Sequence, residues 1–226
     1  MRRSDPVRIS SVLTGVAVVS LVLGACGGGN DGASASSSEA PGGPSPAAAK
    51  ALTQADVPAG LTLGTVNPDQ AFLNAAQAVQ NFSDATITPE ACKAKNIAAQ
   101  EEVRDTVKFG AQQTLARGNQ VVYGVTLLAD AKLGIFEAAG TGECSEVTFG
   151  GTATQTNVRQ ALPDGVDAQG FVLDVTRGSG EQKVESASAY FAKNGVTALV
   201  NANPGTDGKI DRAGFDDLVK RVAARL

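Results

Sequence analysis

Three cysteines and the complete lack of histidine decide which chemistry this 226-residue chain can perform. The cysteines are Cys26, Cys92 and Cys144, and the chain contains no Trp. Without His, neither a Ser-His-Asp triad nor a Cys-His pair can be assembled, and a His-ligated zinc site is excluded. We therefore expect no catalytic residues, no metal site and no cofactor, and the chain is predicted not to be an enzyme.

The first cysteine ends a segment that is typical of secretory signal peptides. Three arginines supply positive charge, residues 9–25 are small or apolar throughout, and Leu-Gly-Ala precedes Cys26. Leu-Gly-Ala-Cys resembles the bacterial lipobox, which implies that Cys26 becomes the first mature residue and carries a diacylglyceryl thioether and usually an N-acyl chain. Two or more acyl chains hold a protein firmly at a membrane. The sequence thus predicts a signal peptide at 1–25 and lipid attachment at Cys26, on the outer face of the cell membrane. The alternative is cleavage after Gly24 or Ala25, which leaves an ordinary free cysteine.

Residues 26–49 are predicted to form a linker between this anchor and one folded domain at 50–226. Gly, Ser, Ala and Pro dominate the linker, and a flexible coil of about 24 residues has an r.m.s. span of about 25–30 Å. Removal of residues 1–25 takes away three Arg and one Asp, which leaves 16 basic and 22 acidic residues and a net charge of −6. This acidic balance argues against a nucleic-acid partner.

The two remaining cysteines, Cys92 and Cys144, are predicted to form a disulfide. Export implies an oxidising compartment, in which a single pair of cysteines is typical of one bridge. The enclosed loop of about 53 residues gives such a bridge a stabilisation of about 4 kcal/mol. A reactive or metal-binding pair is the alternative, although the cysteines are far apart in sequence and no His can join them.

Residues 203–214 copy the centre of a calcium-binding loop but not its ends. Asp207 and Gly208 occupy the fifth and sixth positions, whereas the first, third and twelfth positions hold Asn, Gly and Gly instead of acidic ligands. We expect Asp207-Gly208 to form a turn and Asp211 to cap a helix. Calcium binding is not predicted.

Pairs of carboxylates remain formally possible as catalytic groups. Asp174, Glu181 and Glu185 fall in the later predicted strands, so a pair of them is formally available for acid–base work. We expect these side chains to form a solvated face instead.

The elements that must position these residues alternate between helices and hairpins rather than following strict βαβ order. Strands are predicted at 61–66, 106–115, 120–128, 147–149, 170–175, 183–191 and 196–202. Four helices are predicted, starting at Pro68, at Pro89 with Thr88 as cap, at Asp130 and at Asp211. The first has an apolar face made of Phe72, Leu73, Ala76, Val79 and Phe82. The last has an apolar stripe made of Phe215, Leu218, Val219, Val222 and Leu226. This order predicts an α+β fold, a mostly antiparallel sheet packed against helices with a C-terminal amphipathic helix.

Several segments resemble the extracellular sensor-like domains of mycobacterial and related actinobacterial proteins, which occur as small lipoproteins and as ectodomains of some serine/threonine kinases. The resemblance rests on ALTQADVPAG at 51–60, TPEACKA at 88–94, LLADAKLGIFEAAGTGECSEVTF at 127–149, and the strand–loop–helix end at 197–226. The kinase-linked domains are usually rich in Trp and carry a second disulfide, and this chain has neither. The resemblance therefore implies a lipoprotein of the family rather than the ligand cleft of a kinase ectodomain.

Two functions follow from these expectations. The first is a membrane-anchored extracytoplasmic module, binding or sensor-like, that recognises an envelope protein or a small ligand without catalysis. The second is a carrier or chaperone that holds a lipid or another apolar envelope molecule in a groove between sheet and helices. An apolar cavity lined by the rings of Phe72, Phe136, Phe171 and Phe191 favours the carrier, whereas the same rings packed together favour the binding module.

Overall fold

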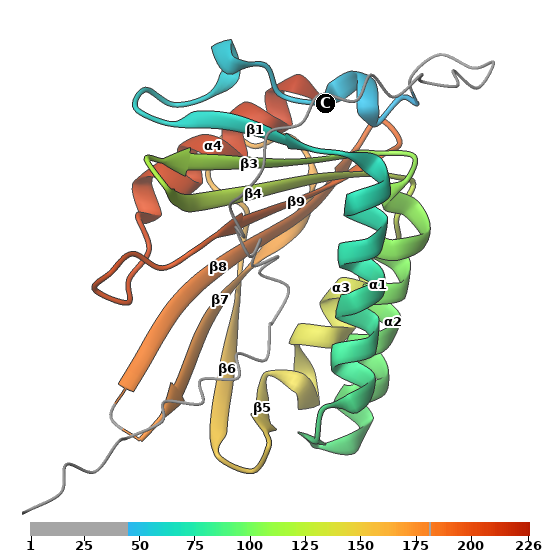
Figure 1. Cartoon of the computed structure of the whole chain (residues 1–226), viewed down its shortest axis with the longest axis vertical. Helices are drawn as coiled ribbons and strands as arrows, with labels where there is room; N and C mark the ends of the chain where they lie inside the picture. Colours follow the sequence, from blue (N-terminus) through green and yellow to red (C-terminus); the bar gives the residue numbers. More distant parts are fainter. Residues whose placement is uncertain (1–44, 181) are drawn as a thin grey trace, which may run out of the picture.

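The computed structural model describes residues 45–180 and 182–226. Within them the strands form one antiparallel sheet of nine, in the spatial order β1-β3-β4-β9-β8-β7-β6-β5-β2 (Figure 1). The strands are β1 (Thr62–Val66), β2 (Ile87–Thr88), β3 (Ala111–Arg117), β4 (Gln120–Ala129), β5 (Glu146–Phe149), β6 (Ala153–Gln160), β7 (Gln169–Ser179), β8 (Gln182–Lys193) and β9 (Val196–Ala202).

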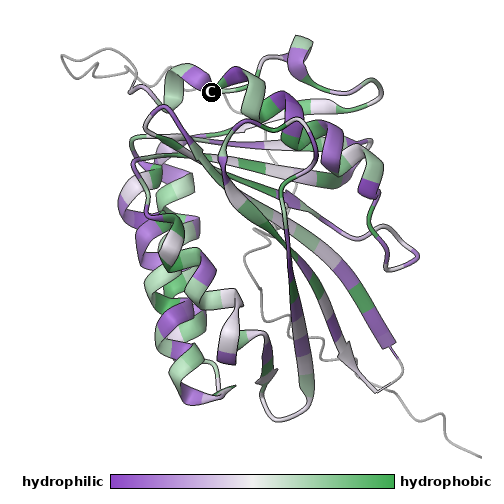
Figure 2. Cartoon of the chain, turned by 180° about the vertical axis from the view of Figure 1, so that it is seen from behind, coloured by the Kyte–Doolittle hydropathy of each residue, from purple (hydrophilic) through white to green (hydrophobic). Residues whose placement is uncertain are grey.

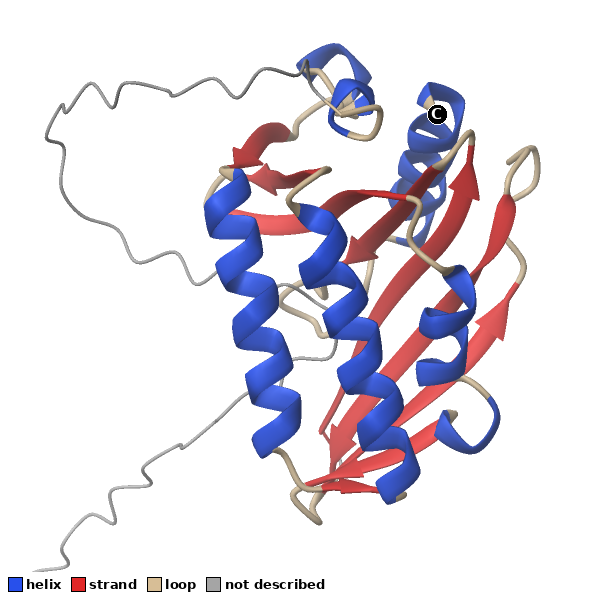
Figure 3. Ribbon diagram, turned by 90° about the vertical axis from the view of Figure 1, so that its right-hand side faces the viewer, coloured by secondary structure: helices blue, strands red, loops and turns tan. Residues whose placement is uncertain are grey.

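Helices cover both faces of this sheet. The α-helices are α1 (Pro68–Asp84), α2 (Glu90–Val107), α3 (Leu133–Gly140) and α4 (Arg212–Arg225), and the short 3₁₀ helices are η1 (Ala48–Lys50), η2 (Gln54–Asp56) and η3 (Gly142–Cys144). The first three α-helices lie on one face of the sheet and α4 lies on the other (Figures 1 and 3). The predicted α+β class, with an antiparallel sheet and a C-terminal helix, is confirmed.

Two apolar layers hold the fold together, one on each face of the sheet. Successive residues of a strand point to opposite faces, so on β7 Val172 packs under α4 whereas Leu173 packs under α2 and α3. A third cluster surrounds the disulfide at the end of the sheet near β5. The sheet is therefore buried on both faces through its central strands.

The C-terminal helix forms as its sequence predicts. The Asp211 carboxylate accepts a hydrogen bond from the Gly214 amide at 3.0 Å, which satisfies one of the free amides of the first turn. The predicted apolar stripe is fully buried against the sheet: Phe215, Leu218, Val219, Val222 and Leu226. The spacing of apolar residues predicts this helix correctly because one face of α4 packs on one broad apolar surface of the sheet.

The first long helix starts at Pro68 as predicted, and Phe82 of its predicted apolar face is buried, but Phe72 and Leu73 of that face are not. Its buried residues are Ala71, Ala75 and Phe82, whereas Phe72 and Leu73 are 37% and 58% exposed. Small residues face inward because α1 packs mainly on α2, with little contact to the sheet. Close approach of two helices favours alanine at the contact, so the larger side chains point outward.

The second helix begins and ends later than predicted. Thr88 belongs to β2, Pro89 is the residue before the helix, and no side chain caps the first turn. The helix then continues to Val107, through positions 106 and 107 that the sequence assigned to a strand, and β3 begins only at Ala111. Val103 and Val107 are buried with Ala99 on one helix face, so packing against the sheet extends the helix.

Two further segments differ from expectation. Asp130 has a positive φ of 51° and does not cap α3, whose preceding residue is Lys132. The strand β6 was not predicted, because its inward positions carry Gln155 and Asn157, polar residues that are nevertheless buried. The folded domain also starts before residue 50, since Ala47 is completely buried in the layer under α4.

Candidate functional site

A hollow of about 290 Å³ lies on the α4 side of the sheet, beside the middle of β7 and the first half of β8, toward the end of the sheet where these two strands are joined. It is bounded by Asp174 and Thr176 of β7, Glu185 of β8, Ile210 of the β9–α4 segment, and Arg212 at the start of α4. The strands of the sheet become hydrophilic toward this end (Figure 2). The hollow is thus a polar depression at the margin of the core.

The pleat of the sheet sets the direction of its polar side chains. Thr176 is the direct cross-strand partner of Glu185, and Asp174 stands two residues before Thr176 on the same strand. Because residues two apart share a face and direct partners lie side by side, these three side chains leave the sheet on the α4 side.

The segment between β9 and α4 closes one side of the hollow and is fixed by backbone hydrogen bonds. The Glu185 amide donates to the Gly208 carbonyl at 2.8 Å, and the Gly205 amide donates to the Lys209 carbonyl at 2.7 Å. The Asp207 side chain accepts from the Lys209 amide at 3.1 Å, which makes the expected turn at Asp207. The calcium-like segment is therefore the wall of the hollow and the approach to α4.

Charges in the hollow are unequal. The guanidinium of Arg212 pairs with Asp174 and, at 3.2 Å, with Asp216, and it lies 5.6 Å above the ring of Phe215. Among the described residues Glu185 has no ion-pair partner. Two carboxylates, Asp174 and Glu185, and one guanidinium, Arg212, line the hollow, and Arg212 is already paired with Asp174 and with Asp216 outside the lining. The carboxylate of Glu185 is therefore the charge in the hollow that would attract a positively charged group.

Solvent exposure limits what this ion pair contributes to folding. The side chains of Arg212 and Asp174 are 41% and 35% exposed, and pairs of this kind stabilise a protein by about 0–1 kcal/mol. The ion pair therefore adds little to stability, and the hollow presents carboxylate oxygens that can accept hydrogen bonds and the hydroxyl of Thr176.

The sequence singled out two of these residues but not their neighbours. Asp174 and Glu185, expected on a solvated face, lie together in the hollow, whereas Glu181 falls outside the described residues. Arg212 was missed because it is 38 residues from Asp174, and only the packing of α4 brings the two together.

The space between sheet and helices is much smaller. A cavity of about 30 Å³ lies there, between apolar and polar side chains that include Phe136, Leu173, Asn157 and Ser188. A volume of this size accommodates one or two waters. The rings of Phe136 and Phe171 stack on Tyr190 with centroids 5.4 and 5.1 Å away, so aromatic side chains fill this interior.

The four phenylalanines considered for a lipid groove do not line one cavity. Phe136 and Phe171 belong to the layer under α2 and α3, Phe191 belongs to the opposite layer under α4, and Phe72 is on the surface. Burial also raises the pKa of the Tyr190 phenol to about 12, an effect that the hydrogen bond with Ser188 partly offsets.

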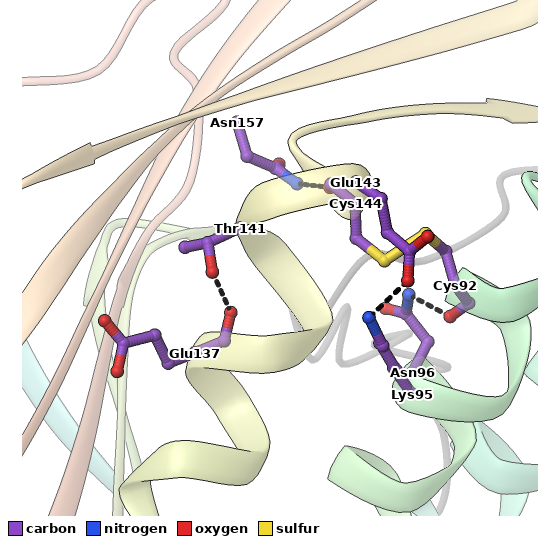
Figure 4. The surroundings of a disulfide bond; sticks show 8 residues. All are labelled: Cys92, Lys95, Asn96, Glu137, Thr141, Glu143, Cys144 and Asn157. Carbon is purple, nitrogen blue, oxygen red and sulfur yellow. Dashed lines mark hydrogen bonds and ion pairs between the residues drawn. A yellow bond between two sulfur atoms is a disulfide. The ribbon is translucent and has the colours of Figure 1, made fainter.

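The predicted disulfide joins Cys92 of α2 to Cys144 of η3, with Cα atoms 5.5 Å apart (Figure 4). Polar contacts fix both ends: the Asn157 amide donates to the Cys144 carbonyl at 2.9 Å, and the Asn96 amide donates to the Cys92 carbonyl at 2.8 Å. Lys95 also pairs with Glu143 at 2.6 Å. Both cysteines are buried, so the bridge ties α2 to the β5 end of the sheet.

Cys26, together with the predicted signal peptide 1–25 and most of the linker, lies outside the described residues. In the part of the chain that the structure covers, no helix is long and apolar enough to cross a membrane.

Comparison with known proteins assigns this chain to no family. No protein-family model matches the chain, and a search of curated proteins finds no match. Among solved structures, an uncharacterised protein of Mycobacterium smegmatis, the Rv0999 ortholog, aligns with 76% of this chain and 91% of its own length, at 14% identity and a TM-score of 0.44. This likeness assigns neither a family nor a function, and membership of the sensor-like domains stays a prediction.

Proposed function

We propose that this protein is a lipid-anchored extracytoplasmic binding module that works without catalysis and recognises a cationic group at the Asp174–Glu185 hollow. The observation that carries the proposal is the contrast between the two spaces of the fold. The polar hollow measures about 290 Å³ and the space under the helices about 30 Å³. Room for a ligand thus exists outside the core, among charged side chains.

The chemistry of the hollow selects the ligand. Glu185 is exposed and without an ion-pair partner among the described residues, and Thr176 stands directly across from it. A primary ammonium, either on a small molecule or at the tip of a lysine side chain of an envelope protein, matches a carboxylate and a hydroxyl in this arrangement.

Carriage of a lipid is the weaker function. A carrier needs an apolar cavity able to bury most of its ligand, of about 300 Å³ or more. The stacked rings of Phe136, Phe171 and Tyr190 occupy the space where such a ligand would lie. Lipid that remains bound to the purified domain in native mass spectrometry would favour the carrier instead.

The ligand class is tested by nuclear magnetic resonance. The isotope-labelled domain 45–226 is titrated with lysine amide, with arginine amide and with the uncharged norleucine amide. We expect lysine amide to shift the amide signals around positions 174, 176 and 185, and norleucine amide to leave them unchanged. Glu185→Gln should abolish the shifts, whereas Glu146→Gln, an exposed change on β5, should not. Equal responses to lysine and norleucine amides would refute a cation site.

The anchor is tested separately in a bacterial host. The full chain should fractionate with membranes, and its mass should include the acyl chains at Cys26. Cys26→Ala should release the domain in soluble form, because no other lipid attachment is proposed. A wild-type chain recovered without acyl groups would contradict the anchoring half of the proposal.

A further inference from the structure

Exposed apolar side chains gather at one end of the domain. Phe72 and Leu73 on the first turns of α1 are 37% and 58% exposed, and Phe109 in the turn between α2 and β3 is 54% exposed. Two other exposed apolar residues, Val158 and Val184, lie on different strands. We call Phe72, Leu73 and Phe109 the apolar end.

Strand register brings the members of this apolar end together. Val66, at the end of β1, is paired with Gln112 of β3. α1 begins two residues after Val66, and Phe109 precedes Gln112 by three residues. The start of α1 and the turn that carries Phe109 therefore leave neighbouring strands at the same end of the sheet, as Figures 1 and 3 show.

The polypeptide that leads from the predicted anchor at Cys26 joins the folded domain at this same end. The Ser45 hydroxyl, on the first described residue, donates a hydrogen bond to the Phe109 carbonyl. Between Cys26 and Ser45 lie 18 residues, and their composition predicts a coil with an r.m.s. span of about 20–25 Å. A lipid on Cys26 would therefore hold Phe109 nearer to the bilayer than the hollow beside the first half of β8.

We propose that the apolar end rests on the lipid surface and orients the domain, with the hollow turned away from the membrane. This inference depends on the proposed lipid anchor, because a surface of three side chains binds a bilayer only when it is held close to it. The end carries mixed charge: Lys108 lies 5.1 Å over the Phe109 ring, and Asp69 is in the first turn of α1. Contact with acyl chains, rather than with charged headgroups, is thus the interaction proposed.

The lack of Trp makes this orientation directly measurable. Phe109→Trp places one fluorophore at the apolar end, and Val158→Trp places one at a position on β6 that is 49% exposed. The mature chain from Cys26 is joined through that sulfur to a maleimide phospholipid, since Cys92 and Cys144 are bridged. The lipid-linked protein is inserted into phosphatidylcholine vesicles that contain brominated acyl chains.

We expect the emission of Trp at position 109 to move to shorter wavelength and to be quenched by the brominated lipid, while Trp at position 158 shows neither change. Added phosphatidylglycerol or salt should leave this difference intact, since headgroup charge is not what holds the end. Leu73→Trp is the second probe if Phe109→Trp does not fold, as judged by circular dichroism.

Equal quenching at both positions, or none at position 109, would overturn the orientation. A shift to shorter wavelength without vesicles that grows with protein concentration would mean that a second copy covers the apolar end, and would also overturn it. Because the lipid is attached chemically, these outcomes do not depend on whether cells acylate Cys26, which the fractionation of Cys26→Ala tests.

Discussion

Replacement of Phe136 tests whether the space between sheet and helices is filled. The ring is 2% exposed, stacks on Tyr190 at 5.4 Å, and borders the 30 Å³ cavity. Phe136→Ala removes this ring and enlarges the cavity, and truncations of buried phenylalanines lower the free energy of unfolding by about 3–5 kcal/mol. We expect a loss in this range, with the stacking on Tyr190 contributing about 0.5–1.5 kcal/mol of it.

The assay is urea unfolding of the oxidised domain followed by circular dichroism. A fall in the midpoint at constant slope reports a change in stability without a change in the surface exposed on unfolding. Phe72→Ala is the matched control, because the same ring is removed from a position that is 37% exposed, and we expect a loss below about 1 kcal/mol. If both variants lowered the free energy of unfolding by a similar, small amount, Phe136 would be loosely packed, and the result would support the carrier function.

Three further perturbations address the disulfide, the tyrosines and the cap of α4. Replacement of both Cys92 and Cys144 by Ala should lower the free energy of unfolding by about 4 kcal/mol, and a reducing agent should then have no further effect on urea unfolding. Burial raises the pKa of both tyrosines, Tyr123 and Tyr190, to about 12, so absorbance titration should detect tyrosinate only near pH 12 in the folded domain and near pH 10 in urea. Stability from these phenols is complete below pH 10 and declines as the pH rises toward 12; tyrosinate at pH 10 without urea would contradict their burial. Asp211→Ala removes the hydrogen bond to the Gly214 amide and should cost about 1 kcal/mol in thermal unfolding, and an unchanged melting temperature would show that the cap is dispensable.

A helix or strand is predicted well from the sequence when its apolar residues follow a regular spacing and all pack against a single surface. α4 is the example, since Phe215, Leu218 and Val222 repeat at helical spacing and all are buried. β6 escaped prediction because its buried positions hold Gln155 and Asn157, whose burial is satisfied by hydrogen bonds rather than by apolar contact. Polar inward residues remove the alternation by which a strand is recognised.

The candidate site was only half predictable for a related reason. Asp174 and Glu185 could be noticed as carboxylates in neighbouring predicted strands, but their register follows from pairing along the whole of β7 and β8. Arg212 reaches Asp174 only because α4 crosses the sheet. The outward face of α1 was likewise set by its packing on α2, a contact that the periodicity of α1 alone does not reveal.

Arg225, near the end of α4, joins the first residues of the folded domain to its C-terminal helix. Its guanidinium donates to the carbonyls of Lys50 and Ala51 at 3.0 and 2.7 Å and pairs with Asp56 at 3.1 Å. The start of the domain and its C-terminus thus lie side by side (Figure 1). A mechanical load applied to the chain before Lys50 would therefore act on contacts of α4 as well as on those of β1.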